Sequence, residues 1–93
     1  MAPDPAASPG GHIEGELSFA RVPHWLAQAD ALAASGTLDL SQVSRADSAG
    51  LALLLELTRR AKASGKPLRL SNPPAQLLGL SEFFGLSTLL RFN

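Results

Sequence analysis

Residues 38–57 read LDLSQVSRADSAGLALLLEL, and this stretch decides the fold. The two leucines of its first letters, LDL, fall on one side of an extended segment, which predicts a short buried strand over 37–40 that leads into a loop. Beyond the loop, Ala, Leu and Glu dominate without an internal proline, which predicts a helix over 48–64. Gly65 stands where a left-handed residue would end this helix.

The rest of the chain alternates between strand and helix patterns in the same way. The further elements expected are a strand over 12–19, a helix over 22–34, a strand over 67–70 and a helix over 75–84. Residues 87–92 fit either a last short strand or an irregular tail. The inner strands are too short and too apolar to leave one face in water. The predicted fold class is therefore α/β, with a small, mixed but mostly parallel sheet covered by helices.

Composition limits the possible functions. A chain of 93 residues has room for one small core. Eight Lys and Arg balance eight Asp and Glu, without a basic run, which argues against nucleic-acid binding. No uncharged helical stretch approaches the roughly 20 residues that a membrane-spanning helix needs, so we expect no insertion into a membrane. Cysteine is absent, which removes disulfide and thiolate chemistry.

The first residues differ from the rest of the chain. Residues 1–11 contain three prolines and few large apolar side chains, so we expect a disordered tail there and a single domain over 12–93. The tail lacks the positive start and apolar run of a secretory leader, and we therefore expect a cytoplasmic protein.

The helix over 48–64 carries more apolar surface than one sheet requires. At 100° per residue, an apolar arc that includes Leu51, Leu53 and Leu57 is already wide enough to face the sheet. Ser48, Ala52, Leu55 and Arg59 instead form a line at the margin of that arc, which we call the Ser48 stripe. A half-exposed leucine in such a line favours a seat for another protein. Packing of Leu55 under a loop is an equally good explanation of the periodicity.

Asp47 and Ser48 stand at the start of the same helix, where free N–H groups favour an oxygen acceptor or a negative charge. Simple capping is the ordinary interpretation of this pair. The functional interpretation is that Ser48 is exposed where a phosphoryl group would be tolerated or where a partner would dock.

The stretch 38–57 resembles the signature of STAS domains, a fold shared by anti-sigma-factor antagonists and transporter-associated modules. STAS domains place a strand, a loop ending in Asp-Ser or Asp-Thr, then Gly-Leu and an apolar helix. Asp47, Ser48, Gly50 and Leu51 take those places here. Three further strings, GELSF at 15–19, PAQLL at 74–78 and FGL at 84–86, resemble the MlaB type within the family.

The resemblance implies a small accessory subunit of a phospholipid-transport ABC complex of Gram-negative bacteria, which maintains the lipid asymmetry of the outer membrane. Its partner would be the ATPase subunit, within a complex with a permease, and it would lie in the cytoplasm, peripheral to the inner membrane. Asp47 and Ser48 would lie at the ATPase contact, to which the helix arithmetic adds Ala52, Leu55 and Arg59. Two alternatives remain: an anti-sigma-factor antagonist switched by phosphorylation of Ser48, and a structural STAS module serving another transporter or sensor.

Catalytic chemistry is not expected. The residues around Ser48 lack the glycine two positions earlier that a nucleophile elbow uses. His12 and His24 are the only imidazoles and have no helical i, i+4 partner, so we expect neither a metal site nor a cofactor. Trp25, Phe83 and Phe84 occupy apolar helical positions, where core packing is the expectation, with Trp25 the most exposed of the three.

Overall fold

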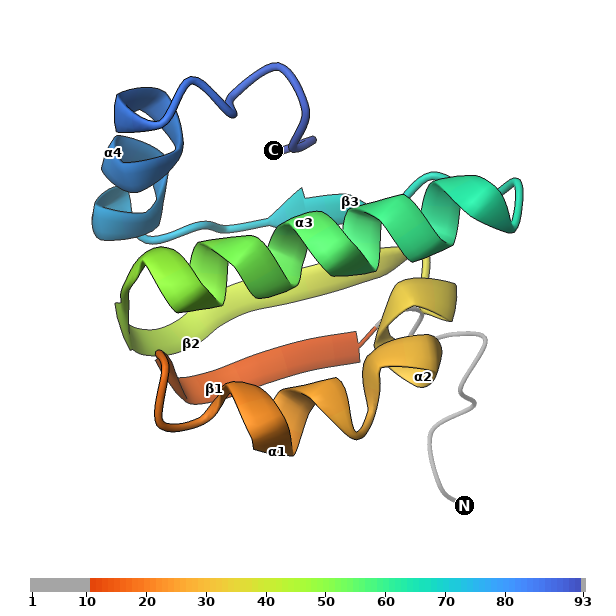
Figure 1. The fold of residues 1–93 in the computed structure, drawn as a ribbon, viewed down its shortest axis with the longest axis horizontal. Coiled ribbons are helices and arrows are strands. Elements are labelled where there is room, and N and C mark those ends of the chain that lie inside the picture. Colours follow the sequence, from red (N-terminus) through yellow and green to blue (C-terminus); the bar gives the residue numbers. More distant parts are fainter. Residues whose placement is uncertain (1–10, 93) are drawn as a thin grey trace.

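The computed structural model describes residues 11–92. Its elements are β1 (Gly11–Leu17), α1 (Val22–Leu26), α2 (Ala29–Ala34), β2 (Thr37–Ala46), α3 (Ser48–Ala63), β3 (Arg69–Ser71) and α4 (Ala75–Phe83). The strands form a sheet in the order β1-β2-β3, and both pairs run parallel. Figure 1 shows α3 crossing in front of the sheet, between α1 and α2 on the β1 side and α4 on the β3 side. The predicted α/β fold is confirmed.

The central strand is longer than the sequence predicted. The expected strand ended at residue 40, whereas β2 runs on to Ala46, opposite Leu17 at the end of β1. Two irregularities in the β1–β2 register accompany this extension. The N-terminal boundary also moves, because Gly11 pairs with Leu38 and belongs to β1 and not to the tail. The rest of the predicted tail lies outside the described residues.

The expectation that neither face of the sheet meets water is wrong for the described part of the chain. In β2 the buried side chains are Leu38, Leu40, Val43 and Ala46, while the residues between them are polar and mostly exposed. Antiparallel sheets commonly leave one face in solvent, and this parallel sheet does so too because α3 and its neighbours cover only the other face.

The long helix supplies much of the core. Its buried residues are Gly50, Leu51, Leu53, Leu54, Leu57 and Ala61, which confirms the predicted sheet-facing arc. Asp47 caps its start, and Gly65 with φ of +86° follows its end, as the sequence indicated.

Gly50 lets α3 approach β1 very closely. A Cβ atom at this position would overlap the backbone carbonyl oxygen of Leu17 and lie 2.7 Å from Leu17 Cγ. The same carbonyl accepts a hydrogen bond of 3.3 Å from the amide of Asp47. Gly50 thus has a packing role, which only the contact between α3 and β1 reveals.

The predicted helix over 22–34 is two short helices, and the prediction of one continuous helix is wrong. After α1 the chain forms a tighter turn, in which the Gln28 amide donates to the carbonyl of Trp25 three residues earlier. The second helix, α2, then begins at Ala29. No proline or glycine lies at this point. Short helices depend on tertiary packing more than on propensity, and here α1 and α2 contact α3 separately.

The aromatic residues do not behave as expected. Trp25, expected to be the most exposed of the three, is only 6% exposed, and its Nε1 lies 3.3 Å from the carbonyl oxygen of Glu16. Phe83 is 82% exposed and Phe84 is 49% exposed. The buried positions of α4 are Leu77 and Ser81, so Phe83 lies on a different face of that helix.

The C-terminal segment returns to the sheet. Leu90 is buried, the amide of Leu70 donates to the carbonyl of Arg91 at 2.8 Å, and Phe92 forms a parallel bridge with Leu70. The undecided segment is therefore a turn that ends beside β3. Across residues 11–92, no helix combines the length and hydropathy that crossing a lipid bilayer demands.

Candidate functional site

Asp47 ties the start of α3 to the end of β1. Its Oδ1 accepts hydrogen bonds from the amides of Ala49 at 2.9 Å and Gly50 at 3.1 Å. Its Oδ2 accepts a third from the amide of Phe19 at 3.0 Å. One carboxylate therefore caps the helix and fixes the loop after β1. The capping interpretation of Asp47 accounts for the bonds from Ala49 and Gly50, and the bond from Phe19 is a separate tertiary contact.

These contacts make the stability of the domain depend on pH. The amide of Phe19, followed by those of Gly50 and Ala49, stabilises the charged carboxylate and lowers the pKa of Asp47 below 3.8. Because the folded-state pKa is lowered, this stabilisation is complete above the unfolded-state value and is lost as the pH falls from there through the folded-state pKa. We expect Asp47→Ala to cost about 1–2 kcal/mol at pH 7. Thermal melts at pH 7 and pH 3 check this: the gap between wild type and variant should shrink at pH 3, and a constant gap would contradict it.

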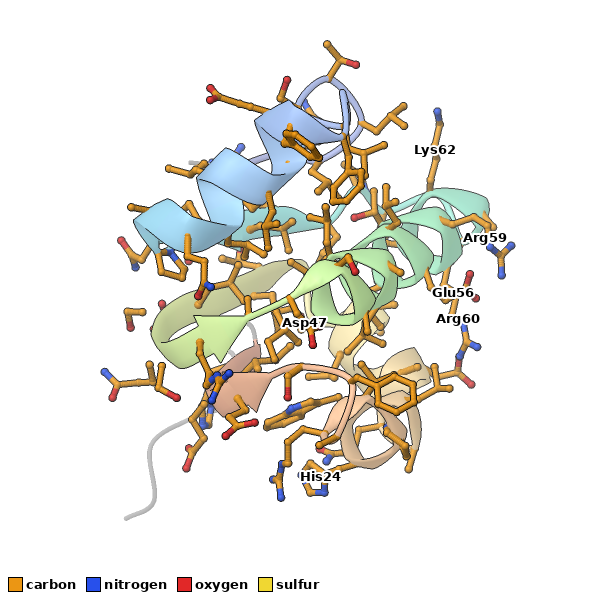
Figure 2. The ribbon with its side chains drawn as sticks, turned by 60° about the vertical axis from the view of Figure 1, so that its left-hand side comes forward. His24, Asp47, Glu56, Arg59, Arg60 and Lys62 are labelled. Carbon is orange, nitrogen blue, oxygen red and sulfur yellow. The ribbon has the colours of Figure 1, made fainter. Side chains whose placement is uncertain are left out.

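The Ser48 stripe runs along the solvent-facing side of α3. Ser48, Ala52 and Arg59 are exposed, whereas Leu55 is half-buried and packs against the core. Figure 2 shows Asp47 at the start of this helix and Arg59 towards its other end. Leu55 and Leu89 of the C-terminal segment line one depression, so the loop covers part of the Leu55 side chain, and the docking interpretation stays a prediction. The structure thus places the predicted residues together on one helix, with an exposed line between two hollows.

The larger hollow is an apolar groove between α1 and α3, which we call the α1–α3 groove. It has a volume of about 580 Å³. Its lining residues are Phe19, Ala20, Val22, Pro23, Leu26, Ala49, Ala52, Leu53 and Glu56. Only the last of these is charged. Ala52 belongs both to this groove and to the Ser48 stripe, so the two form one continuous surface.

Phe19 and Leu26 are site residues that the sequence interpretation missed. Phe19 is 79% exposed and Leu26 is 44% exposed, although both are large and apolar. The alternation over 12–19 placed Phe19 on the buried side of a strand. The strand instead ends at Leu17, and the Phe19 amide is held by Asp47. No local sequence signal indicates that Phe19 is exposed, since its position depends on a contact with a residue 28 positions later.

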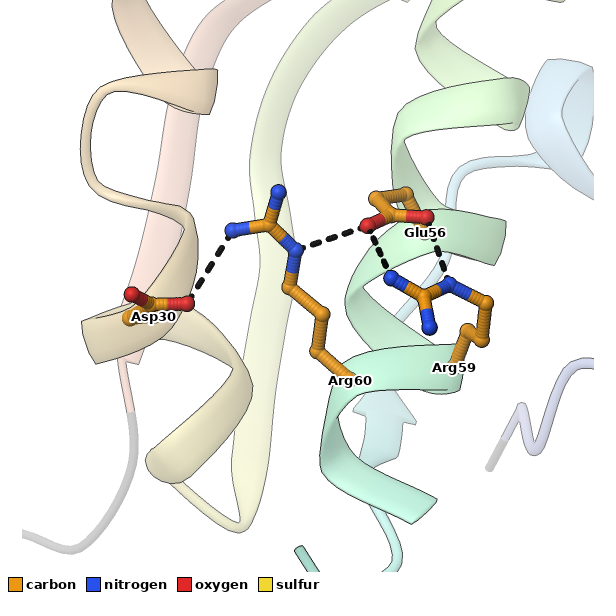
Figure 3. A network of polar contacts seen from close by, with 4 residues as sticks. All are labelled: Asp30, Glu56, Arg59 and Arg60. Atoms are coloured by element: carbon orange, nitrogen blue, oxygen red, sulfur yellow. Dashed lines mark hydrogen bonds and ion pairs between the residues drawn. The ribbon is translucent and has the colours of Figure 1, made fainter. Parts of the chain in front are cut away.

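A network of charged side chains borders the groove (Figure 3). Glu56 accepts bonds from Arg59 at 2.7 and 2.9 Å and from Arg60 at 2.7 Å, and Arg60 also reaches Asp30 of α2 at 3.0 Å. The Arg59 and Arg60 guanidinium groups lower the pKa of Glu56 to about 2. Glu56 therefore stays ionised at physiological pH and fixes Arg59 at the edge of the stripe. Such exposed pairs position side chains more than they stabilise the fold.

The two imidazoles of the chain have hydrogen-bond partners other than Ser48. Ser48 has no imidazole beside it: His12 is next to Glu14 and His24 next to Gln28, both on the surface. Among residues 11–92, no three His, Asp or Glu side chains gather as a metal ion would require. The surface around α3 consists of the largely apolar α1–α3 groove, the exposed residues of the Ser48 stripe, and Arg59, which is bonded to Glu56.

Comparison with known proteins identifies the family of the chain. The family described as "Mlab, STAS domain" matches residues 6–91. The chain is 42% identical to the intermembrane phospholipid transport system binding protein MlaB of Haemophilus influenzae (strain ATCC 51907 / DSM 11121 / KW20 / Rd), over 78% of this chain and 76% of that one. It is also similar to the solved structure of the anti-sigma factor antagonist SpoIIAA in its unphosphorylated form. That match has a TM-score of 0.67 and 23% identity, and covers 90% of this chain and 80% of that chain.

The family match spans nearly the whole chain, and the identity to the Haemophilus protein extends over most of both sequences. The likeness to SpoIIAA adds the fold alone. The chain therefore belongs to the STAS-domain family, in its MlaB-type branch.

Proposed function

We propose that this protein is a non-catalytic subunit of an intermembrane phospholipid transport system, and that it binds the ATPase of that system through α3. The transport role rests on the similarity to a relative named for such a system. The location that follows is the cytoplasm, peripheral to the inner membrane through the ATPase and its permease. The complex would maintain the lipid asymmetry of the outer membrane.

The continuity of the α1–α3 groove with the Ser48 stripe carries the proposal. A groove of about 580 Å³ lined almost entirely by apolar side chains leaves hydrophobic surface in contact with water. Such surface marks protein-interaction sites, particularly where polar residues surround it. Here the exposed Phe19 and Leu26 line the groove, and Glu56, its one charged lining residue, is paired with Arg59. This pattern matches a small interface with an apolar centre and a charged rim.

The position of Ser48 suggests how charge would act on this surface. Asp47 already occupies the amides of Ala49 and Gly50 at the start of α3. A phosphoryl group on Ser48 would add negative charge next in sequence to that carboxylate and would find those two amides already occupied, so it would repel rather than cap. Phosphorylation of Ser48 would then weaken docking. The anti-sigma alternative is not favoured, since the likeness to SpoIIAA concerns the fold alone.

Co-purification of the protein with the ATPase of the proposed transport system tests the proposal. We expect Ser48→Glu and Leu55→Asp to reduce the ATPase recovered, because each places a carboxylate on the docking surface. Matched controls carry the same changes elsewhere: Ser44→Glu on the open face of the sheet, and Leu78→Asp on α4.

Thermal melts identify any variant that fails to fold, and only folded variants count. Recovery that falls with the first pair and stays with the controls supports docking through α3. Equal recovery with all four folded variants would place the ATPase contact on another surface and overturn the proposal.

A further inference from the structure

A second pocket lies on the other side of α3 from the α1–α3 groove. Its volume is about 260 Å³, and we call it the C-terminal pocket. Its lining residues are Thr58, Lys62, Pro67, Leu68, Thr88, Leu89 and Arg91. On α3, Thr58 lies about 120° and Lys62 about 80° around the helix from Ala52 of the groove. The two hollows share no lining residue, but the C-terminal pocket adjoins the depression beside Leu55, with which it shares Thr58, Lys62 and Leu89.

Two cations and no acid line the C-terminal pocket. Within residues 11–92, neither Lys62 nor Arg91 forms an ion pair, whereas Arg59 and Arg60 are both held by Glu56. Figure 2 shows Lys62 extending from α3 on the side where α4 lies, away from Glu56. Their positive charge is therefore uncompensated at short range. The backbone of Arg91 is fixed by its hydrogen bond to Leu70, so its side chain starts from a defined place.

Hydroxyl groups complete the polar part of the pocket. The Oγ1 atom of Thr58 is buried and has no hydrogen-bond partner among the described residues. Buried hydroxyls without partners are costly, so such an atom in a pocket wall is a sign of a missing partner. Thr88 of the C-terminal segment also lines the pocket and carries a second hydroxyl. Pro67, Leu68 and Leu89 supply apolar sides.

We propose that the C-terminal pocket binds a phosphate group. A lysine and an arginine supply charge and several donors, two hydroxyls supply further donors, and no carboxylate competes. Phosphate is the anion whose oxygens accept from all of these groups at once. The group would belong either to the headgroup of an anionic phospholipid or to a free phosphate compound, and the apolar walls suit the carbon atoms beside it.

Titration of the full-length protein with inorganic phosphate tests the site, at constant ionic strength set by chloride. We expect saturable shifts of the amide NMR signals of Thr58, Lys62 and Thr88. Lys62→Gln and Arg91→Gln should each weaken binding about tenfold, because each removes a charge-assisted hydrogen bond. Lys66→Gln is the matched control: it removes an exposed cation close in sequence that does not line the pocket, and binding should stay unchanged.

Vesicles separate the two sources of phosphate. Sedimentation with phosphatidylglycerol vesicles, but not with phosphatidylcholine vesicles, that is lost in Lys62→Gln and Arg91→Gln assigns the pocket to a lipid headgroup. Phosphate binding without vesicle binding assigns it to a soluble compound. Absence of both saturable shifts with phosphate and sedimentation with phosphatidylglycerol vesicles would overturn the proposal. The same weakening in Lys66→Gln as in the other two variants would also overturn it. None of these readouts involves the ATPase, so the result is independent of docking through α3.

Discussion

Replacing Gly50 by alanine should remove a large part of the free energy of unfolding of this protein. The added Cβ atom would overlap the backbone carbonyl of Leu17, which cannot rotate away as a side chain can. The start of α3 must then move off β1, which also strains the bonds that Asp47 makes to Ala49, Gly50 and Phe19. Overpacking of this kind costs about 3 kcal/mol. For a domain of this size we expect a fall in melting temperature of roughly 15 °C.

The same substitution at Gly79 is the control. A Cβ atom there would meet nothing within 4 Å, and the residue lies inside α4. Alanine should therefore stabilise the protein by about 0.5–1 kcal/mol through its better helix propensity. Thermal and urea melts of both variants check the pair. A Gly50→Ala protein as stable as wild type would show that α3 does not approach β1 as described.

Replacing Phe19 by alanine should produce the largest loss of ATPase binding with the least disturbance of the fold. Phe19 is 79% exposed, so little of its side chain supports the core. Its amide, which donates to Asp47, is retained in the variant. Aromatic residues beside an apolar groove are typical interface hot spots, whose truncation costs about 2 kcal/mol or more. We therefore expect affinity for the ATPase to fall about 30-fold.

Phe83→Ala provides a control of the same size and exposure. Phe83 is 82% exposed, but it lies on α4 and does not line the groove. Binding of each variant to the purified ATPase, measured by calorimetry, separates a local effect from a general loss of exposed aromatic surface. Loss of affinity in Phe83→Ala with none in Phe19→Ala would move the docking surface to α4.

The sequence predicted the candidate site only in part. Ser48, Ala52, Leu55 and Arg59 were found from helical periodicity, because all four belong to one long helix whose geometry is local. The α1–α3 groove could not be found this way. It needs Ala52 and Leu53 from α3 together with Phe19 and Leu26 from a distant segment.

Phe83 and Phe84 illustrate the same limit of sequence-based prediction, because they were expected to be buried and are exposed. Helical spacing made them core residues, yet α4 buries Leu77 and Ser81 instead. Which face of a short helix is buried depends on what it meets. Here that contact includes Gln76, whose Oε1 accepts from the amide of Ala46 at 3.0 Å.

The amino-acid sequence by itself determined the start and end of α3, its sheet-facing arc and the alternation of strands and helices, because caps and periodicity act over a few residues. Only the tertiary structure decided the length of β2, the break between α1 and α2, the open face of the sheet and the exposure of Phe19. These features follow from contacts between residues far apart in the chain. The docking surface proposed here is of the second kind, since a groove exists only once two separate segments are packed side by side.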